Sequence, residues 1–424
     1  MSAAIEYCRI CGNADLQPVI DLGMQALTGV FPRTLSQAVP TERLELVRCA
    51  GGPDACGLVQ LRHSCDPALM FGANYGYRSG LNASMVRHLG GLATDVTSRV
   101  SRSAGDLSLD IGSNDGTLLR ALAAPGVTLV GMDPSAEKFG QFYPPEANAI
   151  CDLFSSARFR REFGNKKAKT VTSIAMFYDL ESPSQFMQEV ADVLADDGVW
   201  VFEQSYLPTM IRKDSYDTIC HEHLEYYALS QIQFMADRAG LAILDVSFND
   251  SNGGSFRVTA GHVRSRALHG GPAQEILQRE LADGYSRADV YDRFRERVGQ
   301  RRNELLAFLH SAKRAGQKVY GYGASTKGNV VLQYCGLTAE DLPVIADVNP
   351  DKFGSFTPKS LIPIVAEEEA RKDRPDVFLV LPWHFREFIV AKEQRFLNEG
   401  GHLAFPLPVV EVVSGASQYE SGSR

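Results

Sequence analysis

The segment Leu-Ser-Leu-Asp-Ile-Gly-Ser-Asn-Asp-Gly-Thr at residues 107–117 constrains the fold of this 424-residue chain more than any other. Its apolar start, followed by two closely spaced glycines, predicts a buried strand, a tight turn and the first residues of a helix. Gly112 and Gly116 carry no Cβ, so the backbone at both positions can turn sharply and approach a ligand. This order indicates an α/β protein, in which ligands bind beyond the carboxyl ends of the strands.

A second short strand ends at Asp133 and is followed by Pro134. A carboxylate at this place suits the two hydroxyls of a ribose. The glycine spacing is not Gly-x-Gly-x-x-Gly, because Asp110 precedes the first glycine and Asn114 takes the place of the second. The pattern resembles the S-adenosylmethionine loop of class I methyltransferases more than a dinucleotide fingerprint. The predicted cofactor-binding residues are Asp110, Gly112, Asn114, Asp115, Gly116, Asp133 and Pro134, with Met176 and Phe177 at the end of a later strand.

Length and composition indicate two or three globular domains, since single domains usually contain about 100–200 residues. A net charge of −8 argues against a nucleic-acid-binding or membrane-surface protein. No run approaches the roughly 18 apolar residues of a membrane helix, and the N-terminus has no basic patch before an apolar core. We therefore expect a cytoplasmic protein without nucleic-acid or membrane partners. Its oligomeric state stays open, and a monomer is compatible with the sequence.

Four of the eight cysteines form two pairs near the N-terminus. Cys8 and Cys11 are separated by two residues, and Cys49 and Cys56 follow at a wider spacing. Four thiolates in two pairs can bind a structural zinc ion tetrahedrally, and a small domain often needs such a metal to stay folded. Without an export signal, metal binding is favoured over disulfides. We predict a zinc site formed by these four residues, the alternative being four free thiols.

Strands and helices alternate through the middle of the chain, which predicts a doubly wound parallel sheet. A helical segment at 82–100 precedes this part, and a helical stretch at 271–314 with apolar positions such as Leu277, Leu281 and Leu305 follows it. The predicted strands are 107–111, 128–132, 170–177, 198–203 and 241–248. The predicted domains are 1–70 (zinc-binding), 71–270 (α/β, with a leading helical segment at 71–105), 271–314 (helical connector), 315–413 (second α/β domain) and 414–424 (polar tail).

A second glycine turn, at residues 318–329, repeats the order of strand, turn and helix. Backbone amides at the helix N-terminus, helped by Ser325 and Lys327, can bind a phosphate. A turn with glycines and side-chain amides at 249–257 suits a hydrogen-bonding edge for a polyhydroxyl ligand, and equally an ordinary strand end. The residues predicted from these two stretches to contact substrate are Asn252, Gly254, Ser255, Gly323, Ser325 and Lys327.

His221, Glu222 and His223 lie between the two α/β units, within a run that is rich in tyrosine. The spacing is not that of His-Glu-x-x-His zinc sites. In an extended strand it places the two histidines on one side, and in a helix it places them on opposing sides. A histidine with a near-neutral pKa beside an acid is suited to be a general base, and the alternative is a structural pair.

Together these motifs resemble the S-adenosylmethionine-dependent C-methyltransferases of nucleotide-activated deoxysugars, over nearly the whole chain. The resemblance implies a class I methyltransferase core, a small N-terminal zinc domain and a second Rossmann-like domain at the C-terminus that helps to hold the nucleotide sugar. The matching motifs are the four cysteines before Gly57-Leu-Val-Gln-Leu, Tyr-x-Tyr-x-Ser at 75–79, the glycine turn at 107–117, Glu203-Gln204, His221-Glu-His223, Asn252-Gly-Gly-Ser and Gly321-Tyr-Gly-Ala-Ser-Thr-Lys327.

The resemblance also implies a reaction. A 4-keto group acidifies the proton on C3 of the sugar, a histidine matching His223 removes it, and a tyrosine stabilises the enolate before the carbanion takes the methyl group. The enolate oxygen then needs a positioned donor in a dry site, and transfer between two bound reactants depends mainly on positioning. The predicted catalytic residues are His223, Glu222, His221, Tyr77 and Tyr75, with Ser79 beside the substrate.

Two positions depart from the family pattern. Cys220 stands where relatives often have a tyrosine before the His-Glu-His run, and a thiol is a weak donor. Residues 176–179 read Met-Phe-Tyr-Asp where relatives often have a histidine. Both changes keep open O- or N-methylation of an activated sugar. The paired glycine turns leave an NAD-dependent oxidoreductase as the less favoured alternative.

Overall fold

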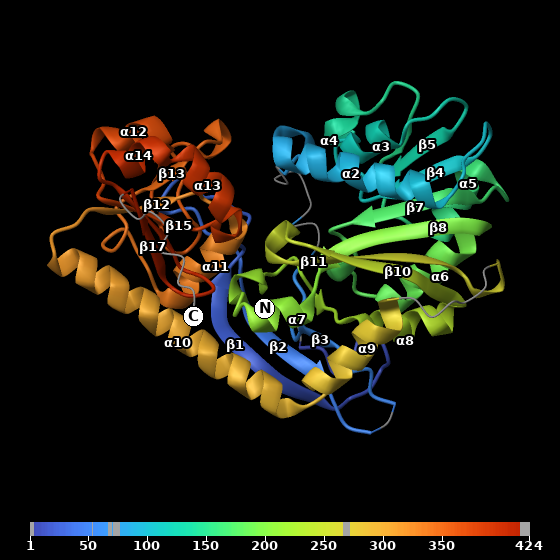
Figure 1. The fold of residues 1–424 in the computed structure, drawn as a ribbon, viewed down its shortest axis with the longest axis horizontal. Coiled ribbons are helices and arrows are strands. Elements are labelled where there is room, and N and C mark those ends of the chain that lie inside the picture. Colours follow the sequence, from blue (N-terminus) through green and yellow to red (C-terminus); the bar gives the residue numbers. More distant parts are fainter. Residues whose placement is uncertain (1–3, 53, 67–69, 71–76, 266–271, 416–424) are drawn as a thin grey trace, which may run out of the picture.

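The structure is a computed structural model that describes residues 4–52, 54–66, 70, 77–265 and 272–415. Within these residues it contains three sheets. Figure 1 shows the central sheet with its helices on the right, the C-terminal sheet with its helices on the left, and the long strands β1 and β2 below, where they connect the two lobes. No helix in the described ranges is long and apolar enough to cross a membrane.

The N-terminal sheet has the strand order β1-β2-β3-β9. Its last strand comes from the middle of the chain, because Val59 pairs with Tyr226 and Gln60 with Glu225. This pairing was not predicted, and it joins the segment around His223 to the cysteine-rich part of the chain. The strands are β1 (Leu16–Ala26), β2 (Thr41–Cys49), β3 (Val59–Leu61) and β9 (Glu225–Tyr226).

The central sheet has the order β10-β11-β8-β7-β4-β5-β6. The strands from β8 to β6 are parallel, as predicted, whereas β11 is antiparallel to both of its neighbours. The predicted strands 107–111 and 128–132 have their observed bounds. The predicted strand 170–177 extends too far, because Ala175 has a φ of +54° and the strand ends before it. The strands are β4 (Leu107–Ile111), β5 (Thr128–Met132), β6 (Asn148–Ile150), β7 (Ala168–Ile174), β8 (Leu194–Ser205), β10 (Leu241–Asn249) and β11 (Ser255–His262).

Helices cover both faces of the central sheet (Figure 1). This arrangement is the doubly wound α/β sheet that the alternating pattern predicts. The helices are α2 (Ala83–Arg99), α3 (Thr117–Leu122), α4 (Ala136–Phe139), α5 (Ser156–Phe163), α6 (Pro183–Val193), α7 (Leu207–Arg212) and α8 (Leu229–Ala239), with short 3-10 turns η1 (Ser79–Leu81), η2 (Gly140–Phe142), η3 (Phe177–Asp179), η4 (Tyr216–Thr218), η5 (Ser251–Gly253) and η6 (Val263–Ser265).

The predicted helical connector is two helices, α9 (Pro272–Asp283) and α10 (Ala288–Arg314). Phe294, Val298, Leu305 and Leu309 on α10 are buried as expected. The prediction for Leu281 is wrong, because its side chain is 74% exposed. Helix α9 therefore buries a narrower apolar face than its sequence indicates.

The C-terminal sheet has the order β14-β13-β12-β15-β16-β17, in which only the last pair is antiparallel. Strand β17 ends at Ser414, and residues 416–424 of the predicted tail lie outside the described residues. The elements are β12 (Val319–Tyr322), α11 (Thr326–Cys335), β13 (Ile345–Asp347), η7 (Pro350–Lys352), β14 (Ile364–Ala366), α12 (Glu367–Lys372), β15 (Val377–Val380), η8 (Trp383–Phe385), α13 (Arg386–Lys392), α14 (Gln394–Asn398), β16 (His402–Phe405) and β17 (Glu411–Ser414).

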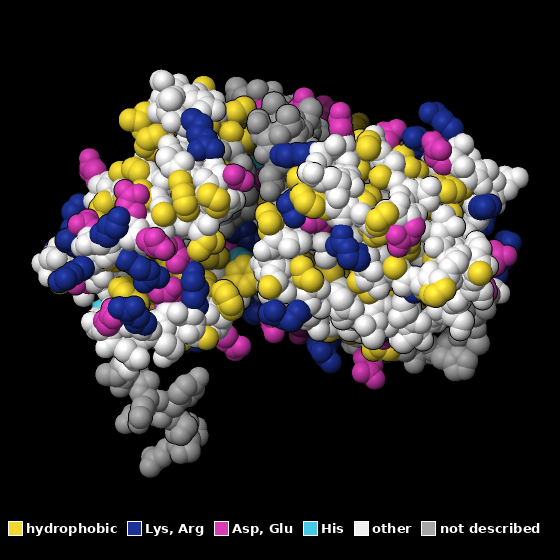
Figure 2. Space-filling view, turned by 90° about the horizontal axis from the view of Figure 1, so that it is seen from above, with side chains coloured by type: hydrophobic (Ala, Val, Ile, Leu, Met, Phe, Trp, Pro, Cys, Tyr) yellow, Lys and Arg dark blue, Asp and Glu magenta, His cyan; other side chains and the backbone are white. Residues whose placement is uncertain are grey.

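One hydrophobic core spans the N-terminal sheet, α7, α10 and the C-terminal sheet. Two further clusters fill the faces of the central sheet. Since a continuous apolar core holds its parts together, the N-terminal sheet and the C-terminal domain form one packed body. The hollow between this body and the central sheet is visible in Figure 2, with histidine and basic side chains along it.

Candidate active site

The first glycine turn is tightly enclosed by side chains. Gly112 and Gly116 both have a φ of +72°. A Cβ on Gly112 would lie 3.0 Å from Cγ of Met176, and one on Gly116 would lie 2.7 Å from the ring of Tyr143. Because neither position has room for a Cβ in a conformation that favours glycine, the turn presents bare backbone at the carboxyl end of β4.

Two predicted carboxylates, Asp110 and Asp133, lie next to this turn. Asp110 is buried and accepts a hydrogen bond of 2.7 Å from Oγ1 of Thr172, and burial raises its pKa to about 7. Asp133 accepts hydrogen bonds from the backbone N–H of Asn114 at 2.8 Å and of Ser135 at 2.7 Å. Asp133 therefore lies at the turn, as a ribose-binding acid should, while Pro134 next to it is exposed.

A short strap at residues 77–80 lies over the turn. The amide of Asn114 donates to the carbonyl oxygen of Tyr77 at 3.1 Å and accepts from the N–H of Ser79 at 3.0 Å. Asp115 accepts from the N–H of Gly80 at 2.9 Å. The predicted Tyr77 and Ser79 are thus tied to the cofactor turn through their backbones, and the Tyr77 side chain is 49% exposed. Tyr75 lies outside the described residues.

His223 lies in the turn that precedes β9. Its Nδ1 is 3.1 Å from the carbonyl oxygen of Thr218, which accepts the Nδ1 proton. The ring centroid is 4.1 Å from that of Tyr178, and the N–H of Leu224 donates to the carbonyl oxygen of Tyr178 at 2.8 Å. These contacts fix the tautomer and leave the Nε2 lone pair free to accept a proton.

Burial, and then the positive charge of Lys327, lowers the pKa of His223 to about 3. The imidazole is therefore neutral over the physiological range, which is the form that a general base needs. An anionic substrate near Lys327 would offset that positive charge and raise the pKa of His223, which would strengthen the base when substrate binds.

Glu222 and His221 point in different directions. The Glu222 carboxylate is 3.5 Å from Oγ1 of Thr28 and borders Gly29, which in turn borders Thr326 at the start of α11. His221 is 1% exposed, and its Nε2 is 3.3 Å from the carbonyl oxygen of Glu42 in the N-terminal sheet. The contacts of His221 favour a structural role, and its predicted catalytic role stays a prediction.

Lys327, on α11 of the C-terminal domain, lies near His223. Its Nζ donates to the carbonyl oxygen of Asn252 at 2.7 Å, and burial lowers its pKa although Asp217 opposes the shift. Trp383 Nε1 donates to Asp217 at 2.8 Å. The structure therefore gathers Asn252, Lys327 and His223 at the junction of three sheets.

Several predicted residues have structural roles. Ser325 caps α11 by accepting from the N–H of Gly328 at 2.9 Å, and Gly323 packs against Pro382. Ser255 donates to the carbonyl oxygen of Ser251, and with Gly254 it lines a separate cavity of about 370 Å³ beside α7 and α9. Phe177 is fully buried and stacks on Tyr227, so its side chain cannot contact a cofactor. Ligand contacts through Ser325, Gly254 and Ser255, or through the backbone of Phe177, stay predictions.

The four predicted zinc ligands converge. The sulfur atoms of Cys8, Cys11, Cys49 and Cys56 all lie within 4.8 Å of one another, with two pairs at 3.4 Å. Tetrahedral zinc with Zn–S bonds of about 2.3 Å requires neighbouring sulfurs to lie within about 4 Å. The donor set and its spacing fit a structural zinc ion.

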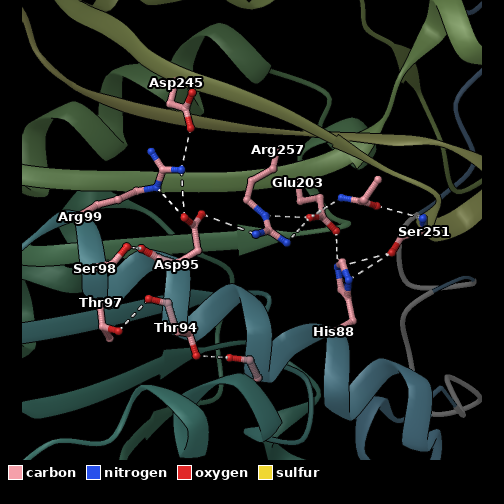
Figure 3. A network of polar contacts seen from close by, with 12 residues as sticks. His88, Thr94, Asp95, Thr97, Ser98, Arg99, Glu203, Asp245, Ser251 and Arg257 are labelled. Atoms are coloured by element: carbon pink, nitrogen blue, oxygen red, sulfur yellow. Dashed lines mark hydrogen bonds and ion pairs between the residues drawn. The ribbon is translucent and has the colours of Figure 1, made fainter. Parts of the chain in front are cut away.

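A polar network around Glu203 was not predicted (Figure 3). Glu203 contacts His88 at 2.5 Å, Asn249 at 2.9 Å and Arg257 at 2.9 Å. Burial alone would raise the pKa of Glu203, but hydrogen bonds and charges from His88 and Arg257 outweigh it and hold the pKa below its ordinary value. The network joins α2, β8 and the β10–β11 hairpin, which carries Asn252. In the sequence, Glu203 belonged to a motif of the resemblance, and Asn249 and Arg257 belonged to the turn at 249–257, but His88 had no signal.

Three family models match consecutive parts of the chain. A zinc-binding domain matches residues 8–71, a methyltransferase domain matches 85–246, and a C-methyltransferase C-terminal domain matches 250–408. A relative from Streptomyces niveus, the C-methyltransferase NovU, is 29% identical over 417 residues, which is 97% of this chain and 98% of NovU.

Solved structures resemble a smaller part of the chain. An S-adenosylmethionine-dependent methyltransferase from Clostridium acetobutylicum is 14% identical and covers 42% of this chain and 92% of its own, with a TM-score of 0.32. The magnesium protoporphyrin IX methyltransferase of Synechocystis, solved with bound S-adenosylmethionine, is 15% identical and covers 42% of this chain and 78% of its own, with a TM-score of 0.31.

Proposed function

We propose that this chain methylates C3 of a nucleotide-activated 4-keto-deoxysugar, because it matches a zinc-binding, a methyltransferase and a C-methyltransferase domain in turn and is similar to the C-methyltransferase NovU over 97% of its length. The alternative function, that of an NAD-dependent oxidoreductase, is no longer favoured. The product would serve deoxysugar or polysaccharide biosynthesis. The proposal depends chiefly on the surroundings of His223. Its Nδ1 donates to the carbonyl oxygen of Thr218, which leaves Nε2 as the proton acceptor, and the positive charge of Lys327 acts on the ring.

The reaction follows from these groups. Nε2 of His223 takes the proton from C3, the C–H electron pair forms a C3–C4 double bond, and the negative charge moves to the keto oxygen. The enolate carbon then attacks the methyl carbon of the sulfonium, the sulfur–carbon bond breaks, and the ketone re-forms with S-adenosylhomocysteine as the leaving group. The cofactor supplies the electrophilic methyl group. The chain holds the two reactants in line, and that positioning provides most of the acceleration.

Incubation with nucleotide-linked 4-keto-sugars in deuterated buffer tests the proposal. We expect deuterium exchange at C3 and transfer of a carbon-bound methyl group when the cofactor is added. The product NMR spectrum separates this outcome from O- or N-methylation, which Cys220 and Asp179 keep open. A panel that gives neither exchange nor transfer contradicts the proposed function.

Asp133→Ala should weaken S-adenosylmethionine binding about 10- to 150-fold, because a hydrogen bond to a charged group contributes roughly 1.5–3 kcal/mol. Calorimetry on the purified variant measures the dissociation constant. Asp347→Ala is a matched control, because Asp347 accepts the N–H groups of Ala324 and Asn349, both at 2.7 Å, in the C-terminal domain. Equal losses in the two variants would mean that loosened loops, and not a lost cofactor contact, explain the effect.

Lys327→Met should lower kcat/KM for a nucleotide sugar about 10- to 100-fold, mainly through KM, because its ammonium is the cation placed to meet the substrate phosphates. Steady-state kinetics at saturating cofactor measure this change. Lys318→Met is the control, because Lys318 stands at the opposite end of β12 and contacts Asp373 on the surface. An unchanged KM in the Lys327 variant would remove this lysine from the substrate site.

A further inference from the structure

One carboxyl oxygen near the turn of His223 has no hydrogen-bond partner among the described residues. Asp179 ends η3, directly after β7, where a class I fold presents its strand ends to ligands. Its Oδ1 is buried and has no hydrogen-bond partner within the described part of the chain. Buried polar atoms are nearly always paired in folded proteins, so an orphan oxygen at a ligand-binding edge indicates that a ligand completes it.

Two backbone contacts hold Asp179 next to the base. Its N–H donates to the carbonyl oxygen of Met176 at 3.1 Å, and Met176 lies against the glycine turn of the cofactor site. The preceding residue, Tyr178, packs its ring on His223 and accepts the N–H of Leu224. Asp179 therefore directly follows residues that contact the cofactor turn and the proposed base.

The charges around Asp179 disfavour its anion. Burial and then the carboxylate of Glu222 raise the pKa of Asp179 well above its ordinary value. Glu225 and the groups of Cys220 and Tyr226 also face it from the turn and β9. The nearby cations stabilise other anionic groups. The charge of Arg9 lowers the pKa of Glu225, and the charge of Lys327 from α11 lowers the pKa of Asp217 and of Cys220.

We propose that Asp179, as a neutral carboxylic acid, donates a hydrogen bond to the keto oxygen of the substrate while the enolate forms. This role rests on the proposed function. As His223 removes the C3 proton, the growing negative charge on the keto oxygen is met by the Asp179 O–H. When the carbon bonds to the methyl group, the ketone re-forms and the proton stays on Asp179. The proton on His223 leaves to solvent after turnover.

Other donors near the site fit this role less well, and the side chain of the predicted Tyr77 is 49% exposed. The thiol of Cys220 is a weak donor. Lys327 already donates to the carbonyl oxygen of Asn252, on the side of the C-terminal domain. A neutral carboxyl gives a short, directed donor without adding a cation that would oppose protonation of His223.

Asp179→Ala and Asp179→Asn test the assignment, with Glu181→Gln as the control because Glu181 is a half-exposed acid two residues away that pairs with Arg9. The rate of C3 deuterium exchange is measured across pH with S-adenosylhomocysteine bound. Loss of an oxyanion donor typically costs 10²–10³-fold, so the alanine variant should lose that much. The wild-type rate should fall as rising pH ionises Asp179, and the asparagine variant, which keeps a donor that does not titrate, should lose this alkaline limb.

Carboxyl ¹³C NMR of the wild type against Asp179→Asn gives a readout that does not need substrate. A protonated Asp179 at pH 7 supports the proposal, and an ionised one overturns it. Wild-type exchange rates and an unchanged alkaline limb in both Asp179 variants would also overturn it. If the wild type exchanges no keto-sugar at all, the proposed function fails, and the donor role fails with it.

Discussion

Replacing His223 by asparagine will abolish methyl transfer and C3 exchange while leaving S-adenosylmethionine binding unchanged. Asparagine can still donate to the carbonyl oxygen of Thr218, as Nδ1 does at 3.1 Å, so the turn should keep its shape. The amide cannot accept a proton from carbon. Removal of a general base typically costs about 10²–10⁴-fold in rate. Exchange rates from NMR and cofactor affinity from calorimetry measure the two expectations separately.

His221→Asn is the matched control for this variant. His221 is two residues away, is buried in the same turn, and contacts the carbonyl oxygen of Glu42 in the N-terminal sheet. We expect it to keep wild-type turnover per folded molecule, with some loss of stability. Near-normal turnover by His223→Asn, or an equal loss in both variants, would contradict the role of His223 as the base.

The pH profile of the free enzyme gives a second check on His223. Its pKa is lowered to about 3 by burial and by Lys327, and the neutral ring is the active form. Activity should therefore be lost only as the pH falls through that value, where the ring takes up a proton. An acid limb near the ordinary histidine pKa of about 6.5 in kcat/KM would show that the ring is accessible to water in the free enzyme.

The parts of this site that depend on local sequence could be predicted. A glycine turn needs only neighbouring residues, so the positions of Gly112, Gly116 and Asp133 followed from spacing alone. The paired cysteines likewise indicated one metal site. The contacts of His221 could not be predicted, because the direction of its side chain depends on whether the backbone forms a strand or a turn, which spacing cannot distinguish.

Contacts between distant segments could not be predicted. Asp217 meets Trp383 across 166 positions of the chain, and β9 joins a sheet whose other strands lie before residue 62. Phe177 was misassigned for a related reason. An apolar residue at a strand end can face either a ligand or the core. The packing of Tyr227 against Phe177 shows that this side chain faces the core.

Cys11→Ser should remove zinc, lower the melting temperature and reduce turnover, although Cys11 is not part of the cleft. A zinc-binding domain gains folding free energy from its metal, about 10–16 kcal/mol in isolated peptides. One serine in place of a thiolate should take the zinc content from one atom per chain toward zero. Metal analysis and calorimetric melting measure the first two effects, with Cys65→Ser as the control because Cys65 is a buried thiol outside the cluster.

The effect on turnover follows from the strand pairing. Cys56 accepts a hydrogen bond through its carbonyl oxygen from Gln231 at 2.8 Å, and the N–H of Leu61 donates to the carbonyl oxygen of Leu224 at 2.8 Å. Leu224 follows His223, so loosening β3 should let the base move. We expect kcat to fall at least tenfold while the affinity for S-adenosylmethionine stays the same, because the glycine turn lies on the central sheet. Full zinc content or wild-type melting in Cys11→Ser would mean that the four sulfurs do not hold a structural metal.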